Sequence, residues 1–315
     1  NPFLFAFYHR LHPFSDFSAL NCDFNRNNLK ILVSLGDVIK DIAYRQRCCY
    51  QRESPSPNSA SLTTTKNLWD EVLFCTEEAL SQQPSYTGAL ALKSAALLGL
   101  NRQHDWDILC DFDRLVQTQT MKLSKGYADL RTFNDALFRR CANSGSKIFE
   151  PHGKSIQKGH RTNSLQRDSR TGPVGVLLEF VNKAAVRYRT KHPVDPQHPY
   201  LAQQPVSWDI EAWGSILGRH GYHKSHIHPR GWLSGVYYGM LSDIMKTEND
   251  KREGCIEFGR PNKHIDDANS PEFPFIRPHE GLMLLFPSYF YHQTIPFDSD
   301  DTRFSISFDL IPLSW

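Results

Sequence analysis

The chain lacks a surplus of charge of either sign. Its 315 residues include 36 lysines and arginines against 34 aspartates and glutamates, which gives a formal net charge of +2. Proteins that bind the phosphate backbone of nucleic acids usually carry a basic excess, because each neutralised phosphate releases a counterion. The composition therefore gives no indication of a nucleic-acid partner.

Long apolar runs and paired cysteines are also missing. The longest apolar stretches, such as residues 282–286, are far shorter than the roughly 18 residues that a membrane span needs. The seven cysteines are scattered, and none belongs to a Cys-x-x-Cys pair of the kind that binds zinc or undergoes redox cycling. We expect free thiols and a soluble cytoplasmic protein with no membrane partner. Residue 1 is asparagine, so we also expect a fragment or a processed form.

The first half of the chain has the pattern of helices. Residues 51–65 are rich in serine, threonine and proline and predict a linker. Leucine and alanine then recur at intervals of three and four residues in the segments 68–80, 86–98 and 106–116, which predicts three helices. Residues 67–102 resemble one tetratricopeptide unit, with Trp69 on the first helix and Pro84 at the turn. Packing helices that brace another domain and a partner-docking array both remain open.

The second half has the pattern of short strands. Residues 144–172 predict a polar loop, and residues 173–188 predict a helix with Pro173 in its first turn. Four β-rich runs follow between turn residues, at 232–240, 254–258, 282–286 and 304–311, and they predict an antiparallel barrel or a double-sheet jelly roll. We therefore expect an α+β protein: an N-terminal segment and linker (1–66), a helical region (67–143) and a jelly-roll domain with a leading loop and helix (144–315).

Histidines cluster where the strand-rich part begins. His226 and His228 are two residues apart, and in an extended strand such residues point to the same face, where both imidazoles can bind one metal ion. A lone His-x-His pair is weak support for a metal site. His292 follows a buried run and a proline turn, where it can approach as a third ligand.

The segment 303–310 alternates strictly between apolar and polar residues. One face carries Phe304, Ile306, Phe308 and Leu310, and the other carries Arg303, Ser305, Ser307 and Asp309. The polar face either meets solvent, as in an ordinary half-exposed strand, or looks into a jelly roll beside the metal. In the second case Arg303 and Ser305 provide a receptor for a carboxylate, because the guanidinium fork matches carboxylate geometry.

Taken in order, three motifs resemble the 2OG-Fe(II) oxygenases of bacteria and phages, within the iron(II)/2-oxoglutarate-dependent oxygenase superfamily. They are HIHPRGWLSGVYY at 226–238, GLMLLFPSYFYH at 281–292 and RFSISFD at 303–309. The resemblance covers about residues 200–312 and implies a double-stranded β-helix. It also implies Fe(II) bound by His226, His228 and His292, with O2 and 2-oxoglutarate as cosubstrates.

The resemblance further implies that the distal carboxylate of 2-oxoglutarate contacts Arg303 and Ser305. Tyr237 or Tyr238 would also contact the cosubstrate, and Tyr237 is preferred. Most of the superfamily has a carboxylate where this chain has His228, so the site carries one negative charge fewer, and zinc also accepts three histidines.

The predicted function is oxidation, most simply hydroxylation, of a protein, peptide, amino-acid-like or other small-molecule substrate, with release of succinate and CO2. Two alternatives remain open at this point. One is a zinc-bound jelly roll without catalysis, and the other is a helical-repeat interaction protein.

Overall fold

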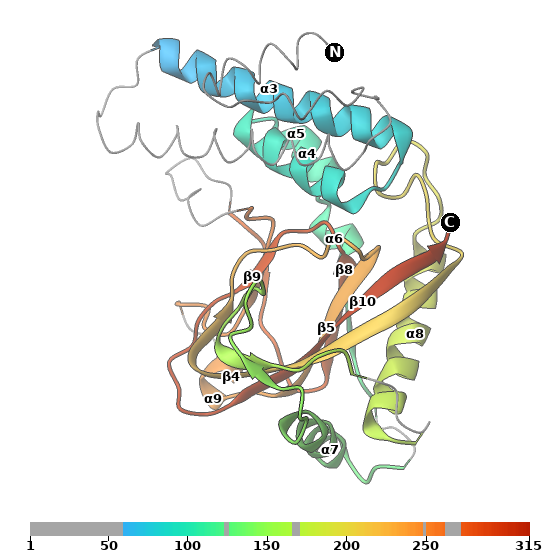
Figure 1. Ribbon diagram of the computed structural model, residues 1–315, viewed down its shortest axis with the longest axis vertical. Helices are drawn as coiled ribbons and strands as arrows, with labels where there is room; N and C mark the ends of the chain where they lie inside the picture. Colours follow the sequence, from blue (N-terminus) through green and yellow to red (C-terminus); the bar gives the residue numbers. More distant parts are fainter. Residues whose placement is uncertain (1–58, 123–125, 166–170, 248–249, 262–271) are drawn as a thin grey trace, which may run out of the picture.

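The described part of the chain combines helices with two antiparallel sheets (Figure 1). A computed structural model describes residues 59–122, 126–165, 171–247, 250–261 and 272–315. Most of the predicted N-terminal segment, residues 1–58, lies outside them. The predicted mixture of helices and antiparallel strands is confirmed, with a jelly-roll-like strand region.

The helical region consists of α3 (Ser59–Gln82), α4 (Thr87–Gly99), α5 (Gln103–Leu109) and α6 (Phe112–Leu115). The expected linker was wrong at residues 59–65, which are helical. Once a helix is nucleated, each added residue gains a hydrogen bond at little further cost, so α3 extends into a segment that has no apolar pattern. The single helix expected at 106–116 is divided, because the Asp111 side chain accepts a hydrogen bond from the Arg114 amide and starts α6 anew.

Helices α3 and α4 pack closely and are tied to the strands. A Cβ atom on Gly99 would lie 2.3 Å from the Trp69 ring, so glycine is what lets the end of α4 approach α3. The Thr87 hydroxyl donates a 2.7 Å hydrogen bond to the Gly231 carbonyl, and the Tyr289 hydroxyl donates to the Leu109 carbonyl. These contacts join the helical region to the strand region; the tetratricopeptide resemblance stays a prediction.

The larger sheet has seven antiparallel strands. Their order is β1 (Gln117–Thr120), β8 (Leu282–Pro287), β5 (Leu233–Met240), β10 (Arg303–Ser314), β4 (Ser207–His223), β3 (Ile156–Arg161) and β2 (Ile148–Phe149). The smaller sheet has the order β7 (Phe275–Ile276), β6 (Ile256–Phe258) and β9 (His292–Thr294). The four predicted runs are confirmed as β5, β6, β8 and β10.

Strands β2 and β3 correct the prediction of a loop at 144–172. The β3 sequence IQKGHR is short and polar, with no alternation that marks a strand. It becomes a strand because β4 supplies a partner, with His160 opposite Ile216 and Gly159 opposite Leu217. A Cβ atom on Gly159 would lie 2.4 Å from Leu217, so the pairing depends on glycine at this position.

The apolar face of β10 is covered by helices, which leaves its polar face inside the strand region. Helix α7 (Leu130–Ala142) brings the Phe138 ring to 5.5 Å from the Phe304 ring. Helix α8 (Pro173–Lys191) contacts α7, and its Asn182 side chain accepts a 3.1 Å hydrogen bond from the Trp208 indole of β4. A short helix, α9 (Asp243–Lys246), lies between β5 and β6 in the chain. The helix predicted to start at Pro173 is confirmed as α8.

Two expectations from composition can be checked on the described residues. None of the helices there is both long and apolar enough to cross a bilayer. Cys75, Cys110, Cys141 and Cys255 are buried free thiols, and burial raises the pKa of Cys75 to about 11. The expected cytoplasmic location stays a prediction.

Candidate metal and cosubstrate site

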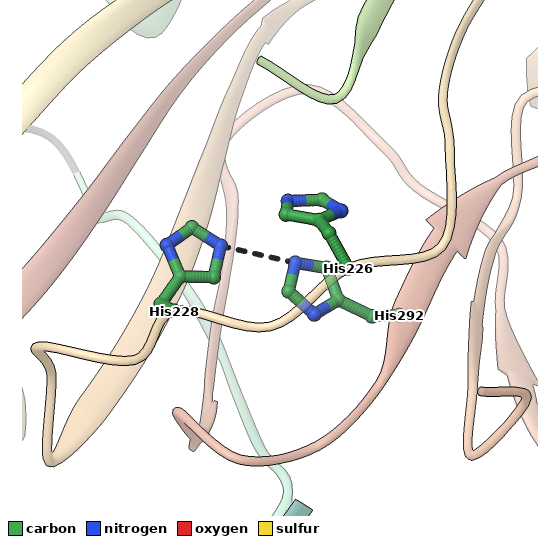
Figure 2. A group of neighbouring side chains, drawn as sticks. All are labelled: His226, His228 and His292. Carbon is green, nitrogen blue, oxygen red and sulfur yellow. Dashed lines mark hydrogen bonds between the residues drawn. The ribbon is translucent and has the colours of Figure 1, made fainter. Parts of the chain in front are cut away.

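The three predicted histidines come together from two chain segments (Figure 2). His226 and His228 lie in the extended stretch between β4 and β5, and His292 opens β9. The backbones of His226 and His292 form an isolated antiparallel bridge, with N–O distances of 3.1 and 3.0 Å. One ring nitrogen of each histidine lies within 4.8 Å of the others, and Figure 2 shows the rings gathered around one point.

A hydrogen-bond acceptor faces the Nδ1 atom of each ring. For His226 it is the Lys224 carbonyl at 2.7 Å, and for His292 it is the Phe290 carbonyl at 2.9 Å. The His228 Nδ1 lies 2.8 and 3.0 Å from the two carboxylate oxygens of Asp309. Because carbonyls and carboxylates only accept, each Nδ1 carries a proton, and Nε2 is the ring nitrogen that each histidine can offer to a metal ion.

This donor set fits a divalent cation. The Nε2 atoms of His228 and His292 lie 3.2 Å apart, within hydrogen-bond distance when one of them carries a proton, and a divalent cation bound by both nitrogens would take the place of that proton (Figure 2). Burial and the neighbouring His228 lower the pKa of His226 to about 3, and burial holds the pKa of His292 well below its usual value. Neutral imidazoles are the form that binds Fe(II) or zinc.

The histidines line a cavity of about 380 Å³ enclosed by the two sheets. That volume lies within the usual range for small-molecule sites. The polar face of β10 points into the cavity, and its neighbours are Ser215 on β4 and Tyr238 on β5, both opposite Ser305. Of the two orientations left open for this face, the structure has the inward one.

Arg303 is the most unusual group in the cavity wall. The side chain is 1% exposed, yet its Nε and Nη1 atoms have no hydrogen-bond partner among the described residues. A buried guanidinium without an anion costs folding free energy, because its hydration is lost and nothing replaces it. Ser305 lies beside it, and the Tyr238 hydroxyl is also buried without a partner. The three groups fit a bound carboxylate.

The preference for Tyr237 over Tyr238 is corrected by the orientation of β5. The Tyr237 hydroxyl donates a 2.6 Å hydrogen bond to Asn134 on α7, on the outer face of the sheet. Tyr238 points the other way and lines the cavity, with its ring 5.4 Å from the Arg303 guanidinium carbon. The sequence could not decide between the two tyrosines, because the chain bends at residues 229–231 before β5 begins and the alternation of side chains cannot be followed through a bend.

Comparison with known families agrees with this geometry. Residues 211–309 match the model of the family described as "Putative 2OG-Fe(II) oxygenase", and the match contains all three histidines together with Arg303 and Ser305. This part of the chain is similar to 2OG-Fe(II) oxygenase domains. Enzymes of this kind require Fe(II), 2-oxoglutarate and O2, in agreement with the predicted cofactors. The match covers about a third of the chain.

Several solved structures are similar to the chain at low sequence identity. A prolyl-4-hydroxylase from Pseudomonas putida is 14% identical with a TM-score of 0.43, covering 65% of this chain and 96% of that one. A prolyl hydroxylase from Trichoplax adhaerens, in complex with a hypoxia inducible factor peptide fragment, is 11% identical with a TM-score of 0.42, covering 67% and 90%. HygX from Streptomyces hygroscopicus, with nickel and 2-oxoglutarate bound, is 10% identical with a TM-score of 0.42, covering 66% and 87%. These values are too low to carry an argument about function. No curated protein matches the chain.

The wall of the cavity also contains a cationic side chain, Arg161, that the sequence did not predict. Arg161 on β3 lies over the Trp213 ring at 4.4 Å, and that ring stacks on His228 with a centroid distance of 5.6 Å. The Arg161 guanidinium donates a hydrogen bond to the Thr162 carbonyl at 3.3 Å and forms no ion pair with a carboxylate of the described residues. Arg161 was missed because its segment was expected to be a loop.

Proposed function

We propose that the oxygenase domain binds Fe(II) through His226, His228 and His292 and oxidises a C–H bond of its substrate. One observation carries the proposal: the cavity that gathers the three imidazoles also contains the buried guanidinium of Arg303, whose Nε and Nη1 atoms have no hydrogen-bond partner among the described residues. A structural zinc site has no use for a buried carboxylate receptor, so this pairing favours the oxygenase over the zinc-bound alternative.

The residues have separate tasks in this proposal. The three imidazoles hold the metal, and the acceptors at their Nδ1 atoms fix the ring orientations. Arg303, Ser305 and Tyr238 hold the distal carboxylate of 2-oxoglutarate, which orients the cosubstrate toward the metal. Fe(II) with 2-oxoglutarate and O2 supplies the oxidation of an unactivated C–H bond, with succinate and CO2 as products.

We propose that residues 144–315 form the oxygenase domain and that the helical region 67–143 braces it. The support is the contact of α4 and α5 with the loops that carry the site, including the hydrogen bond from Thr87 to Gly231, three residues beyond His228. This arrangement favours a bracing role for the helices over a role in docking a partner protein.

For the substrate we propose a molecule with an anionic group, such as an amino acid or an acidic peptide. Four cationic side chains line the cavity, Lys154, Arg161, Arg230 and Arg303, against the carboxylates of Glu211 and Asp309. Arg303 is assigned to the cosubstrate and Arg230 is paired with Glu211 at 3.3 Å. Arg161 therefore supplies a cation for the substrate, with Trp213 as an apolar wall.

Succinate formation tests the oxygenase assignment. Purified protein supplied with Fe(II), 2-oxoglutarate and ascorbate in air should form succinate slowly even without substrate, measured by mass spectrometry. His292→Ala should abolish this turnover, because two imidazoles hold the metal poorly. His279→Ala, an exposed histidine bonded to the neighbouring Glu280 carbonyl, should retain it. Equal succinate formation in parent and His292→Ala would contradict the proposal.

A matched pair of small molecules tests the anionic substrate site. With Co(II) and 2-oxoglutarate bound, 3-phenylpropionate should bind more tightly than its neutral amide, because Arg161 receives the carboxylate and Trp213 the ring. Loss of one charge-assisted hydrogen bond in Arg161→Gln should remove roughly a tenfold preference. Arg230→Gln is the control, since Arg230 is already paired. A preference that survives in Arg161→Gln, or its absence in the parent, would exclude this site.

A further inference from the structure

Asp309 is a buried carboxylate directly behind one of the proposed metal ligands. It lies on the inward face of β10, opposite Ser234 on β5, and is 8% exposed. Its oxygens lie 2.8 and 3.0 Å from the Nδ1 atom of His228. The Ser234 hydroxyl donates a 2.7 Å hydrogen bond to the same carboxylate and lies 2.7 Å from the Ser288 hydroxyl, so the carboxylate is held in place.

The three histidines differ in the charge of their acceptors. His226 and His292 donate to backbone carbonyls, which are neutral, whereas His228 donates to a carboxylate. His228 is also the ligand that occupies the position where the resembling oxygenases usually have a carboxylate. The ligand itself lacks the negative charge. That charge is instead present on Asp309, which is in hydrogen-bond contact with the His228 imidazole.

We propose that Asp309 replaces, through His228, the negative charge that a carboxylate ligand would have contributed to the metal. Asp309 is a positioning residue, because it acts on the metal through the imidazole. The inference rests on the proposed three-histidine site. A carboxylate at Nδ1 draws the ring proton toward itself, which raises the electron density and basicity of Nε2 and fixes the ring orientation. Counted over Fe(II), dianionic 2-oxoglutarate and Asp309 alone, the formal charge would be −1, the same as with a carboxylate ligand in place of His228.

A second carboxylate in the same cavity wall offers a matched comparison. Glu211 lies on β4 opposite Asp309 and also lines the cavity. Its charge is paired with Arg230 at 3.3 Å, and no hydrogen bond to any of the three histidines is formed. Asp309→Asn removes a negative charge that contacts His228, whereas Glu211→Gln removes one that lies only in the cavity wall. Comparing these two isosteric substitutions separates the two effects.

Co(II) affinity of the metal-free protein tests the inference without relying on turnover. Competition with a chromophoric chelator at neutral pH gives the dissociation constant. Asp309→Asn keeps a hydrogen-bond acceptor but removes the charge, and it should weaken Co(II) binding by roughly 10- to 100-fold. Glu211→Gln should leave the constant unchanged. Ser234→Ala, which keeps the charge but frees the carboxylate, should weaken binding less than Asp309→Asn does.

A double-mutant cycle with His228→Asp distinguishes this role from a merely structural one. When position 228 itself carries the charge, Asp309 becomes a like charge beside a ligand. Asp309→Asn should then leave Co(II) affinity unchanged or strengthen it in the His228→Asp background. The same weakening in both backgrounds, or none in the parent, would overturn the inference. Thermal melts of the metal-free variants by circular dichroism establish that each is folded. A parent protein that does not bind Co(II) would instead overturn the proposed metal site, and this inference with it.

Discussion

Arg303 is the side chain whose replacement should affect the cosubstrate most. Its Nε and Nη1 atoms are buried without a partner, so a carboxylate that binds there gains charge-assisted hydrogen bonds with little competition from water. Arg303→Gln should raise the dissociation constant for 2-oxoglutarate by roughly 10- to 100-fold, as measured by calorimetry on Co(II)-loaded protein. Arg303→Lys should also weaken binding, because an ammonium group lacks the planar fork.

Arg230→Gln is the matched control for Arg303, since Arg230 is exposed and paired with Glu211. An unchanged dissociation constant for 2-oxoglutarate in Arg303→Gln would show that the cosubstrate does not bind at Arg303. The position of Arg303 was predictable from sequence because strict alternation fixes parity along one uninterrupted strand. The position of Tyr238 was not predictable, because the alternation of side chains cannot be followed through the bend at residues 229–231. The position of Arg161 was not predictable either, because no sequence pattern marks strand β3.

Strand β5 lies between β8 and β10 in the larger sheet, and its packing depends on a glycine. A Cβ atom on Gly235 would lie 2.3 Å from the Leu284 carbonyl oxygen of β8 and 2.4 Å from the Phe308 ring of β10. Gly235→Ala should therefore lower the free energy of unfolding by about 1–3 kcal/mol, because both neighbours have to shift. Urea unfolding followed by tryptophan fluorescence measures the change.

The control for Gly235 is Gly218→Ala on β4, where an added Cβ meets no atom within 4 Å. Equal stability of the two variants would mean that the sheet accommodates the extra carbon. At this scale the sequence predicted strands that have strong apolar runs, such as β8 and β10. It did not predict β2 and β3, which exist because β4 offers a partner, since pairing between distant segments leaves no local signal.

Stability of the whole molecule should fall in mild acid. Burial lowers the pKa of His192 to about 4 and also lowers the pKa of His198, both away from the three-histidine cluster. In the unfolded chain both titrate near about 6.5. Below that pH the unfolded chain takes up protons that the folded protein does not, so the free energy of unfolding decreases.

The thermal midpoint of the metal-free protein should accordingly be steady above about pH 7 and fall between about pH 6.5 and pH 4. His192→Gln should show a smaller fall over this range, because one of the groups that bind protons on unfolding is gone. A variant whose pH dependence is as steep as the parent's would show that His192 is not among those groups.

At the scale of the whole chain, the mixture of helices and antiparallel strands followed from apolar periodicity alone. The seven-stranded order did not, because β1 pairs with β8 across more than 150 residues of intervening chain. The hydrogen bond from Thr87 to the Gly231 carbonyl, which joins a helix to the strand region, could not be predicted either, because neither a threonine nor a backbone carbonyl marks its distant partner in the sequence.

The most direct measurement of the central claim is anaerobic addition of Fe(II) and then 2-oxoglutarate to the metal-free protein, followed by visible absorption. The account predicts a weak charge-transfer band from 2-oxoglutarate chelated to Fe(II). The band should be lost in His292→Ala, and in Arg303→Gln it should appear only at higher 2-oxoglutarate concentration. A parent protein that retains zinc and shows no band would contradict the oxygenase site.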